Sequence, residues 1–422
     1  MKFAFEARLQ SLDFIRIGVI VLLLFVNTLF LQSIYHLVYM KVVVVMMIFT
    51  VLYSLYYRSK THQVLSNVYI KKYLRWILTL FAFFMLHYYL MPINQHASIF
   101  AWLTQLVIVL CVIFMLGSLT FERAMYLFMI SATIASVLAS VYTLVYFSGE
   151  SIAYMLRLGD INSTGGLRNI NYIAQNVFFF STFTLYLIYT KKKNRIYVIF
   201  FIIQLILVLL SGTKRTFFSL TIFLIVLNYE RFRKSFLKNS LLLIFYLGVL
   251  LYFLFNNDLL YNILGSRIEI MLADLGLIQA NSLNLIDNST NIRRLLWDEA
   301  SKMAYDTPLL GYGHAYFQTH SFGFNTAEST FHTHNQYTEL YLSFGIFGFL
   351  LYYSLFVTTT IRLIRKKNKT EMTYLFLAFF VALFFIIEPS SVTYHVLPTY
   401  YLYLFFAYMY SMQKSQSLKI VT

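Results

Sequence analysis

The sequence predicts an all-α polytopic membrane protein with about twelve transmembrane helices. Of its 422 residues, 59% are hydrophobic and only 12% are charged, which is too apolar for a water-soluble chain of this length. The charged residues gather in short clusters between apolar runs that are long enough to cross a bilayer. Lipid is therefore expected to surround most of the chain.

The distribution of basic residues predicts the side of the membrane that each loop occupies. The formal net charge of +16 does not indicate nucleic-acid binding, because Lys and Arg form no stripe with interleaved aromatic residues. They fall in alternate loops, and the positive-inside rule then puts both termini in the cytoplasm. Lys2, Arg8 and Arg16 precede the apolar stretch Ile17–Leu31, and no small-residue cleavage site follows it, so we expect an uncleaved first span.

An even number of spans, about twelve, fits two cytoplasmic termini. The first six apolar runs are Ile15–Leu31, Val38–Tyr57, Leu74–Met91, Ile99–Leu119, Ala124–Phe147 and Tyr172–Tyr189. The later runs are Ile196–Leu210, Phe217–Leu227, Leu237–Phe255, Tyr337–Val357, Met372–Ile387 and Val392–Met412. We find no internal repeat and no inverted similarity between the two halves, a pattern that many transporters show.

The seventh and eighth runs are short, and they meet in the segment from Ser211 to Arg215. Two such helices predict a turn that lies below the membrane surface and is buried in protein. An unpaired cation at that depth costs several kcal/mol, so we expect an anionic group to meet Arg215. The alternative is that Lys214 and Arg215 merely extend to lipid headgroups.

The chain divides into an N-terminal bundle at residues 1–255, a large extracytoplasmic loop at 256–336 and three C-terminal spans at 337–422. The loop is expected to form a small helical cap, because apolar positions recur in it at helical spacing. Asn291 is expected to cap a helix that ends before Pro308 and begins with Arg293 and Arg294. Arg293 lies one turn before Trp297 and can point toward the membrane, and a solvated helix end is the alternative. The predicted apolar face contains Ile292, Leu295, Leu296, Ala300 and Met303.

Histidines precede span ten at the expected outer mouth of the bundle. Of the nine histidines, His334 is the strongest candidate for a general base, because imidazole exchanges protons near neutral pH. His332 and His334 can also ligate zinc, but no spaced carboxylate or further histidine completes a set. We therefore expect no metal and no cofactor. Cys111 lies inside an apolar run and is expected to be a small buried hydrophobe.

Two further loop features bear on function. A Gly- and Asn-rich loop ahead of span six puts Arg168 and Asn171 at the outer interface, although the pattern itself indicates only a turn. Many metal-dependent sugar transferases hold a cation with two acidic residues one position apart, and the extracytoplasmic loops lack this arrangement. Asp298 and Glu299 are adjacent and diverge on a helix.

Four segments together resemble the O-antigen polymerase and O-antigen ligase superfamily of bacterial membrane glycosyltransferases. The segment SGTKRT at 211–216 is similar to the family's turn between two short spans, with Arg215 in the position of its functional arginine. The segments RRLLW at 293–297 and DTPLLGYG at 306–313 resemble the family's Arg and Trp helix and its Pro-Leu-Gly-x-Gly turn. Arg293 aligns best with the family's arginine, and Arg294 is the alternative.

The other two segments lie at either end of this region. HNQYTEL at 334–340, which continues into LSFGIFG at 342–348, is similar to the family's His-Asn motif and the glycine-bearing span after it. RNINYIA at 168–174 resembles the Pro-Asn signature, with Ile170 where proline is usual. The resemblance covers about the second half of the chain.

The resemblance implies a helical C-type glycosyltransferase fold without a required metal and a donor glycan on undecaprenyl diphosphate. Arg215 and Arg293 would neutralise the departing diphosphate. His334 would remove the proton from an acceptor hydroxyl that attacks the anomeric carbon, and Asn335 would orient the ring or the substrate. The further substrate-binding candidates are Lys214, Arg294, Arg168, Asn171, Tyr312 and Glu339.

A polymerase and a ligase share this chemistry and differ in the acceptor. We predict a polymerase of repeat units for capsule, exopolysaccharide or O-antigen, because no acceptor-specific feature of a ligase is recognisable. The composition, rich in Lys, Asn, Ile and Tyr, also suits a low-GC Gram-positive bacterium, which lacks lipid A. The expected site is the outer face of the cytoplasmic membrane, with a flippase and a chain-length regulator as partners. The alternatives are transfer to lipid A core or protein by a ligase and, in another class, a lipid-linked sugar flippase.

Overall fold

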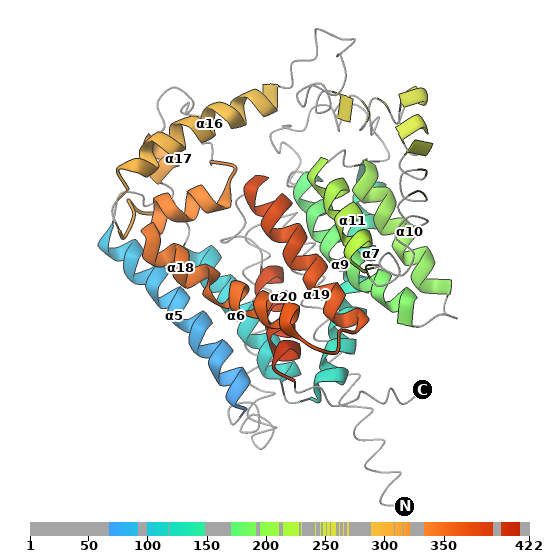
Figure 1. Ribbon diagram of the computed structural model, residues 1–422, viewed down its shortest axis with the longest axis horizontal. Helices are drawn as coiled ribbons and strands as arrows, with labels where there is room; N and C mark the ends of the chain where they lie inside the picture. Colours follow the sequence, from blue (N-terminus) through green and yellow to red (C-terminus); the bar gives the residue numbers. More distant parts are fainter. Residues whose placement is uncertain are drawn as a thin grey trace, which may run out of the picture. The chain divides into compact units, whose positions relative to one another are not determined.

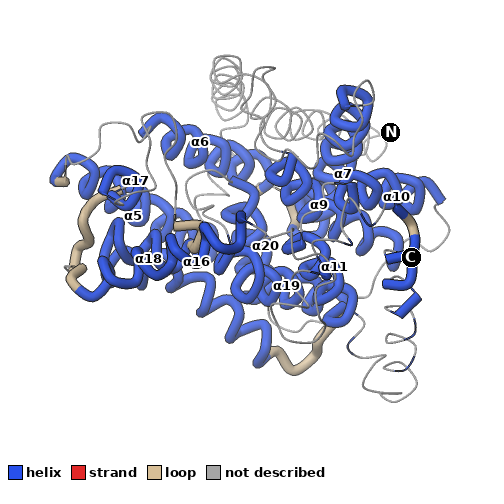
Figure 2. Tube along the Cα trace, turned by 90° about the horizontal axis from the view of Figure 1, so that it is seen from above, coloured by secondary structure: helices blue, strands red, loops and turns tan. Residues whose placement is uncertain are grey.

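The computed structural model describes residues 67–91, 99–117, 119–147, 170–190, 195–210, 214–227, 288–307, 309–314, 316–320, 333–390 and 398–413, with residue 229 and scattered residues from 241 to 269. Within this part the chain forms helices joined by loops, without a strand (Figure 2). The first helices are α5 (Val68–Leu90), α6 (Ile99–Leu116), α7 (Phe121–Phe147), α9 (Ile170–Thr190), α10 (Arg195–Leu210) and α11 (Lys214–Leu227). The later ones are α16 (Asn288–Tyr305), α17 (Tyr316–His320), α18 (Gln336–Arg365), α19 (Glu371–Ala382), the π-helical turn η3 (Leu383–Ile387), the 3₁₀ turn η4 (Glu388–Ser390) and α20 (Pro398–Met412).

The prediction of an all-helical membrane protein is confirmed. Each predicted span from the third to the eighth coincides with a helix, and so do the last three. Four helices of the described part are long and apolar enough to cross a membrane, at Val68–Leu90, Phe121–Val145, Gln336–Arg365 and Glu371–Ser390. The first two predicted spans and most of the ninth lie outside the described residues, so the total of about twelve spans and the side of each terminus stay predictions.

The chain folds into two compact units, each made of two segments. Unit 1 contains Met1–Tyr56 and Cys111–Leu285, and unit 2 contains Tyr57–Leu110 and Ile286–Thr422. The division at residues 255 and 336 describes membrane topology and stays a prediction. Helix α16, in the segment predicted to form a cap, belongs to the same unit as the C-terminal helices.

In unit 1, α7, α9 and α10 pack against one another, and α11 packs against α9 and α10. Small residues on α7 allow this close approach, as is usual for helices in membranes. The buried small residues of α7 are Ala132, Ala135, Ser136, Ala139 and Ser140. Gln204 of α10 donates from Nε2 to the carbonyl of Thr133 at 3.4 Å and to the hydroxyl of Ser136. The hydroxyl of Thr184 on α9 donates to that of Thr133 at 3.0 Å, so polar bonds join all three helices.

In unit 2, α18 is the central helix, and α5, α16, α17, α19 and α20 all pack against it (Figure 1). The hydroxyl of Tyr73 on α5 donates to the carbonyl of Tyr401 on α20 at 2.6 Å. The rings of Phe379 and Tyr403 stack with their centroids 4.0 Å apart, which joins α19 to α20. Another side of α18 exposes apolar side chains, as a helix surrounded by lipid does. These exposed residues are Phe347, Leu350, Val357, Ile361 and Ile364.

Helix α16 differs from the predicted helix in two respects, namely where it begins and which residues form its apolar face. It begins at Asn288, so Asn291 lies inside the first turn and is not the capping residue. Four residues that favour helix caps follow one another from Asn288 to Asn291, and the sequence does not distinguish among them.

The predicted apolar face of α16 is only partly correct. Leu296 and Ala300 are buried against Phe317 and Leu342, as expected, and Met303 packs on this cluster. The prediction that Leu295 is buried is wrong, because 51% of its surface is exposed. Neighbouring residues point about 100° apart on a helix, so a narrow contact with α18 buries one of the two leucines and leaves the other outside. The side chain of Ile292 lies outside the described residues.

Candidate functional site

The predicted site residues fall into two groups, one in each unit, and each group is described by itself. The group in unit 1 contains Arg168, Asn171, Lys214 and Arg215. Arg168 lies outside the described residues, Asn171 lies in the first turn of α9, and Lys214 and Arg215 are the first two residues of α11. The side chains of these helical residues are not among those described. The structure puts the basic pair at the N-terminal end of α11, after α10 ends at Leu210. The buried turn and the roles of Lys214 and Arg215 stay predictions.

Buried polar groups surround these helix ends. Gln175 and Asn176 on α9 and Thr216 and Ser219 on α11 are at most 5% exposed. Within the described part of the chain, the side-chain oxygens of Asn176, Thr216 and Ser219 are buried without a hydrogen-bond partner. Buried polar atoms are normally paired, and the start of a helix favours negative charge. The first two turns of α9 and α11 are therefore suited to receive a polar or anionic group.

In unit 2, α18 is broken at Gly345, whose backbone has φ 61° and ψ −168°. The loop after α16 enters this break. The N–H of Tyr312 donates to the carbonyl of Leu342 at 2.8 Å, and the N–H of Gly313 donates to that of Ser343 at 3.0 Å. In return, the N–H of Phe347 donates to the carbonyl of Leu309 at 3.5 Å. The loop thus supplies partners to backbone groups that the break leaves without their helical ones.

Two glycines make this close approach of backbones possible. Gly311 has φ 77°, and a Cβ atom there would lie 2.6 Å from the backbone nitrogen of Phe344. A Cβ atom on Gly345 would lie 2.6 Å from the backbone nitrogen of Gly311. Both positions have backbone angles that favour glycine, and neither has room for a side chain. The Pro-Leu-Gly-x-Gly turn and the glycine-bearing span are therefore two halves of one structure.

His87 of α5 fixes the same loop from another side. Its Nε2 lies 2.5 Å from the carbonyl oxygen of Leu310, and since a carbonyl only accepts, Nε2 carries the hydrogen. The ring of Phe344 meets His87 edge-on at 5.1 Å and stacks on Phe84 at 4.3 Å between centroids. Sequence reasoning missed His87, because its partner is 223 positions away and no motif links the two.

A network of caps holds the turn that carries His334. The side chain of Asn335 accepts hydrogen bonds from the N–H groups of Tyr337 at 3.0 Å and Thr338 at 3.3 Å, so it caps α18. The hydroxyl of Thr333 donates to the carbonyl of Asn335 at 2.8 Å, and the N–H of Thr333 donates to the carboxylate of Glu339 at 3.3 Å. Thr333 and Glu339 are buried. The first turn of α18 therefore positions the residues just before it.

His334 lies at the centre of this turn with φ 53°, the only positive φ of a residue other than glycine in the part that the structure describes. The left-handed region costs roughly 1–2 kcal/mol for such a residue, and strain of this kind persists where the surrounding contacts enforce it. The side chain is partly exposed. Backbone strain at a partly exposed histidine is an indication of function.

A buried carboxylate supports the same helix end. Glu388 in η4 is fully buried and accepts hydrogen bonds from the hydroxyl of Tyr353 at 2.6 Å and from the side chain of Gln336 at 3.3 Å. Gln336 also donates to the hydroxyl of Tyr352 at 3.0 Å, and it directly follows Asn335. Glu388 therefore positions the start of α18. An ionisable residue at membrane depth is a candidate for function, and the sequence analysis did not select Glu388.

The remaining candidates of unit 2 lie around this centre. Arg294 is exposed on α16, and the side chain of Arg293 lies outside the described residues. The hydroxyl of Tyr312 donates to the carbonyl of Asp306 at 2.5 Å, and its ring stacks on Tyr316 with the centroids 4.4 Å apart. Burial and the nearby Tyr316 and Asp306 raise the pKa of Tyr312, so its hydroxyl keeps its proton at neutral pH.

Residues 173–353 match the family described as O-antigen ligase. This segment of the chain is similar to that family. The matched segment extends from α9 to the middle of α18 and includes the start of α11, the loop in the α18 break and the His334 turn. The resemblance to the polymerase and ligase superfamily is thereby confirmed, and it implies membrane glycosyl transfer of the O-antigen ligase and polymerase type. No curated protein matches the chain.

The matched segment contains several predicted site residues whose positions the structure gives. It brings His334, Asn335, Glu339 and Tyr312 onto one assembly of α18 and its inserted loop. His332, the partner in the zinc alternative, lies outside the described residues. The supporting residues that the sequence did not reveal are Thr333, Gln336, Glu388 and His87. Gln336, Glu388 and His87 act through contacts between residues far apart in the sequence, whereas Thr333 contacts residues only two and six positions away.

Proposed function

We propose that the chain polymerises undecaprenyl-diphosphate-linked oligosaccharide repeat units into a cell-surface polysaccharide at the outer face of the cytoplasmic membrane, without a metal ion. The observation that carries the proposal is the turn at His334. A histidine is held there in a strained backbone, inside the segment that matches the O-antigen ligase family, by capping contacts from Thr333, Asn335 and Glu339. A partly exposed imidazole on a backbone that is held in place suits a general base.

The reaction follows from these roles. His334 takes the proton of an acceptor hydroxyl, the hydroxyl oxygen bonds to the anomeric carbon, and the bond from that carbon to the diphosphate oxygen breaks. The electron pair leaves with the diphosphate, whose charge Arg215 and Arg293 neutralise. Arginine supplies fixed bidentate charge, so this route needs no divalent cation.

The supporting residues have separate parts in the proposal. Lys214 and Arg294 add positive charge for the diphosphate, and Arg168, Asn171 and Tyr312 contact sugars. The side chains at the N-terminal cap of α18 act differently. Asn335 orients the turn by capping α18, and Glu339 is buried against Thr333, so we assign Glu339 to positioning the base and not to the sugar.

The test is a transfer assay in liposomes with one lipid-diphosphate-linked repeat unit, a chelator and a gel readout of chain length. The matched variant is His334→Asn, because asparagine tolerates the left-handed backbone but supplies no base. We expect a ladder from the native chain and a rate at least about 100-fold lower for His334→Asn. A ladder that persists in a folded His334→Asn protein would remove the base assignment.

The ligase alternative is favoured by the family description, which names O-antigen ligase. The same liposomes distinguish it when lipid A core or an acceptor protein is added. A product that appears only with that acceptor, and no ladder without it, would make the chain a ligase. Loss of lipid-linked units from the outer leaflet in an Arg215→Ala variant would instead favour a flippase, since a transferase does not determine exposure.

A further inference from the structure

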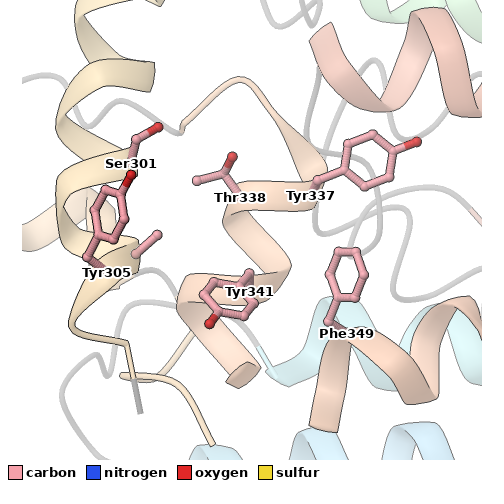
Figure 3. A pocket seen from close by; sticks show the side chains of 7 residues that line it. Ser301, Tyr305, Tyr337, Thr338, Tyr341 and Phe349 are labelled. Atoms are coloured by element: carbon pink, nitrogen blue, oxygen red, sulfur yellow. The ribbon is translucent and has the colours of Figure 1, made fainter. Parts of the chain in front are cut away.

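An open groove lies in unit 2 between α16 and α18 (Figure 3). Its volume is about 480 Å³, within the range of small-molecule sites. Side chains from α16 form one wall, and side chains from both sides of the α18 break form the other. The lining residues are Ser301, Ala304, Tyr305, Tyr337, Thr338, Tyr341 and Phe349.

The lining is aromatic, bears hydroxyl groups and carries no charge. Three tyrosines and a phenylalanine supply ring faces, and Ser301 and Thr338 supply hydroxyls that donate and accept. An aromatic face carries negative charge density and attracts the slightly positive C–H bonds of a sugar ring. A diphosphate would instead need cations, which are not among the seven lining side chains. This chemistry fits a neutral pyranose.

The three tyrosine rings of the groove differ in their exposure and in their contacts. Tyr305 is 91% exposed at the end of α16, so its ring is available to a ligand. Tyr337 donates its hydroxyl to the carbonyl of Phe384 at 2.6 Å, which fixes the orientation of its ring. Figure 3 shows Tyr341 on the same helix as Thr338, with its ring toward the wall formed by α16.

The groove is rigidly attached to the His334 turn. Thr338 lines the groove, and its backbone N–H is held by the side chain of Asn335. Thr338 is the third residue of α18, and Asn335, which caps α18, directly follows His334 in the sequence. The other wall is fixed as well, because the loop that follows α16 is bonded into the α18 break. A sugar in the groove would therefore be held at a set distance from the base.

We propose that this groove binds the neutral pyranose of the acceptor glycan and so orients the hydroxyl that His334 deprotonates. The assignment rests on the proposed function and adds the acceptor subsite to it. Tyr305 and Tyr341 are the residues that bind the ring faces, with Ser301 and Thr338 as hydrogen-bonding partners. The lipid part of the substrate is the competing occupant, and the test below separates the two.

The test measures binding of a neutral oligosaccharide, released by mild acid from the host's own surface polysaccharide, to the full chain in nanodiscs. Binding is followed by saturation-transfer NMR titration in the His334→Asn background, so that no transfer takes place. We expect Tyr305→Ala and Tyr341→Ala each to raise the Kd about three- to tenfold, and Tyr341→Phe to leave it within about twofold. Tyr89→Ala is the control, since Tyr89 is 70% exposed but does not line the groove.

Each outcome decides the proposal. Loss of binding in the two alanine variants but not in the controls supports an acceptor subsite, and the KM for acceptor in the transfer assay should then rise while kcat changes little. Undiminished binding in both alanine variants, or no binding by the parent protein, overturns it. Weaker binding of undecaprenyl diphosphate in place of the oligosaccharide assigns the groove to lipid. Oligosaccharide binding that depends on Tyr341 without any transfer by the native chain would overturn the proposed function and leave the sugar site standing.

Discussion

Replacement of Gly345 by alanine should break the junction between α18 and its inserted loop. The residue has φ 61° and ψ −168°, a combination that is essentially restricted to glycine and costs another residue about 1–3 kcal/mol. The added Cβ would also overlap the carbonyl of Leu309 and lie 2.6 Å from the nitrogen of Gly311. Both are backbone atoms of a loop that is hydrogen-bonded to α18, so no change of side-chain rotamer can relieve the overlap. We expect the free energy of unfolding to fall by more than about 4 kcal/mol.

The measurement is denaturant unfolding in detergent micelles, followed by far-UV circular dichroism, with Gly248→Ala as the matched control. A Cβ on Gly248 meets nothing within 4 Å, and the residue is helical and exposed, so alanine there should stabilise by about 0.5–1 kcal/mol. The same substitution thus has opposite effects at the two positions. Equal unfolding midpoints for the two variants would refute the close approach of loop and helix.

Three further substitutions test other contacts by the same unfolding measurement. Asn335→Ala should lower the free energy of unfolding by about 1 kcal/mol through loss of the α18 cap, whereas Asn335→Asp should keep the cap and the unfolding midpoint. Equal unfolding midpoints for the two variants would contradict the capping role. Glu388→Ala should cost about 3 kcal/mol because it leaves the buried hydroxyl of Tyr353 unpaired, and Glu388→Gln should cost less than half of that since its amide oxygen still accepts. Gln204→Leu should cost only about 1 kcal/mol, as side-chain hydrogen bonds between membrane helices usually do, and a loss of several kcal/mol would show that this estimate is wrong.

The helices could be predicted from the sequence because burial in lipid requires long apolar runs, and such runs are visible without any tertiary information. The ends of α16 could not be predicted as well. Its start lies among four consecutive cap-forming residues, and the choice between Leu295 and Leu296 as the buried residue depends on where α18 lies. The break at Gly345 could not be predicted either, because glycine is tolerated within membrane helices and does not by itself indicate a break.

The candidate site divides in the same way. His334 and Asn335 could be selected because they stand together in a motif before an apolar run. Glu388 could not, since its contact with Gln336 joins residues that are 52 positions apart and depends on the π-helical turn before η4. His87 is a similar case, because its partner is a backbone carbonyl and any residue could supply that atom. Contacts of this kind follow only from the packed structure.

The structure also separates the structural duties of the motif residues from their chemistry. Gly311 and Gly345 are required by the contact between two backbones, and Asn335 is required by the end of α18. These three positions would be needed in a protein with no catalytic activity. His334 is different, because the left-handed backbone there would suit asparagine or glycine better. A histidine at that position makes the fold less stable by roughly 1–2 kcal/mol, and the capping contacts offset this strain. The proposed reaction gives a reason for an imidazole at this place, because its ring can accept the proton of the acceptor hydroxyl.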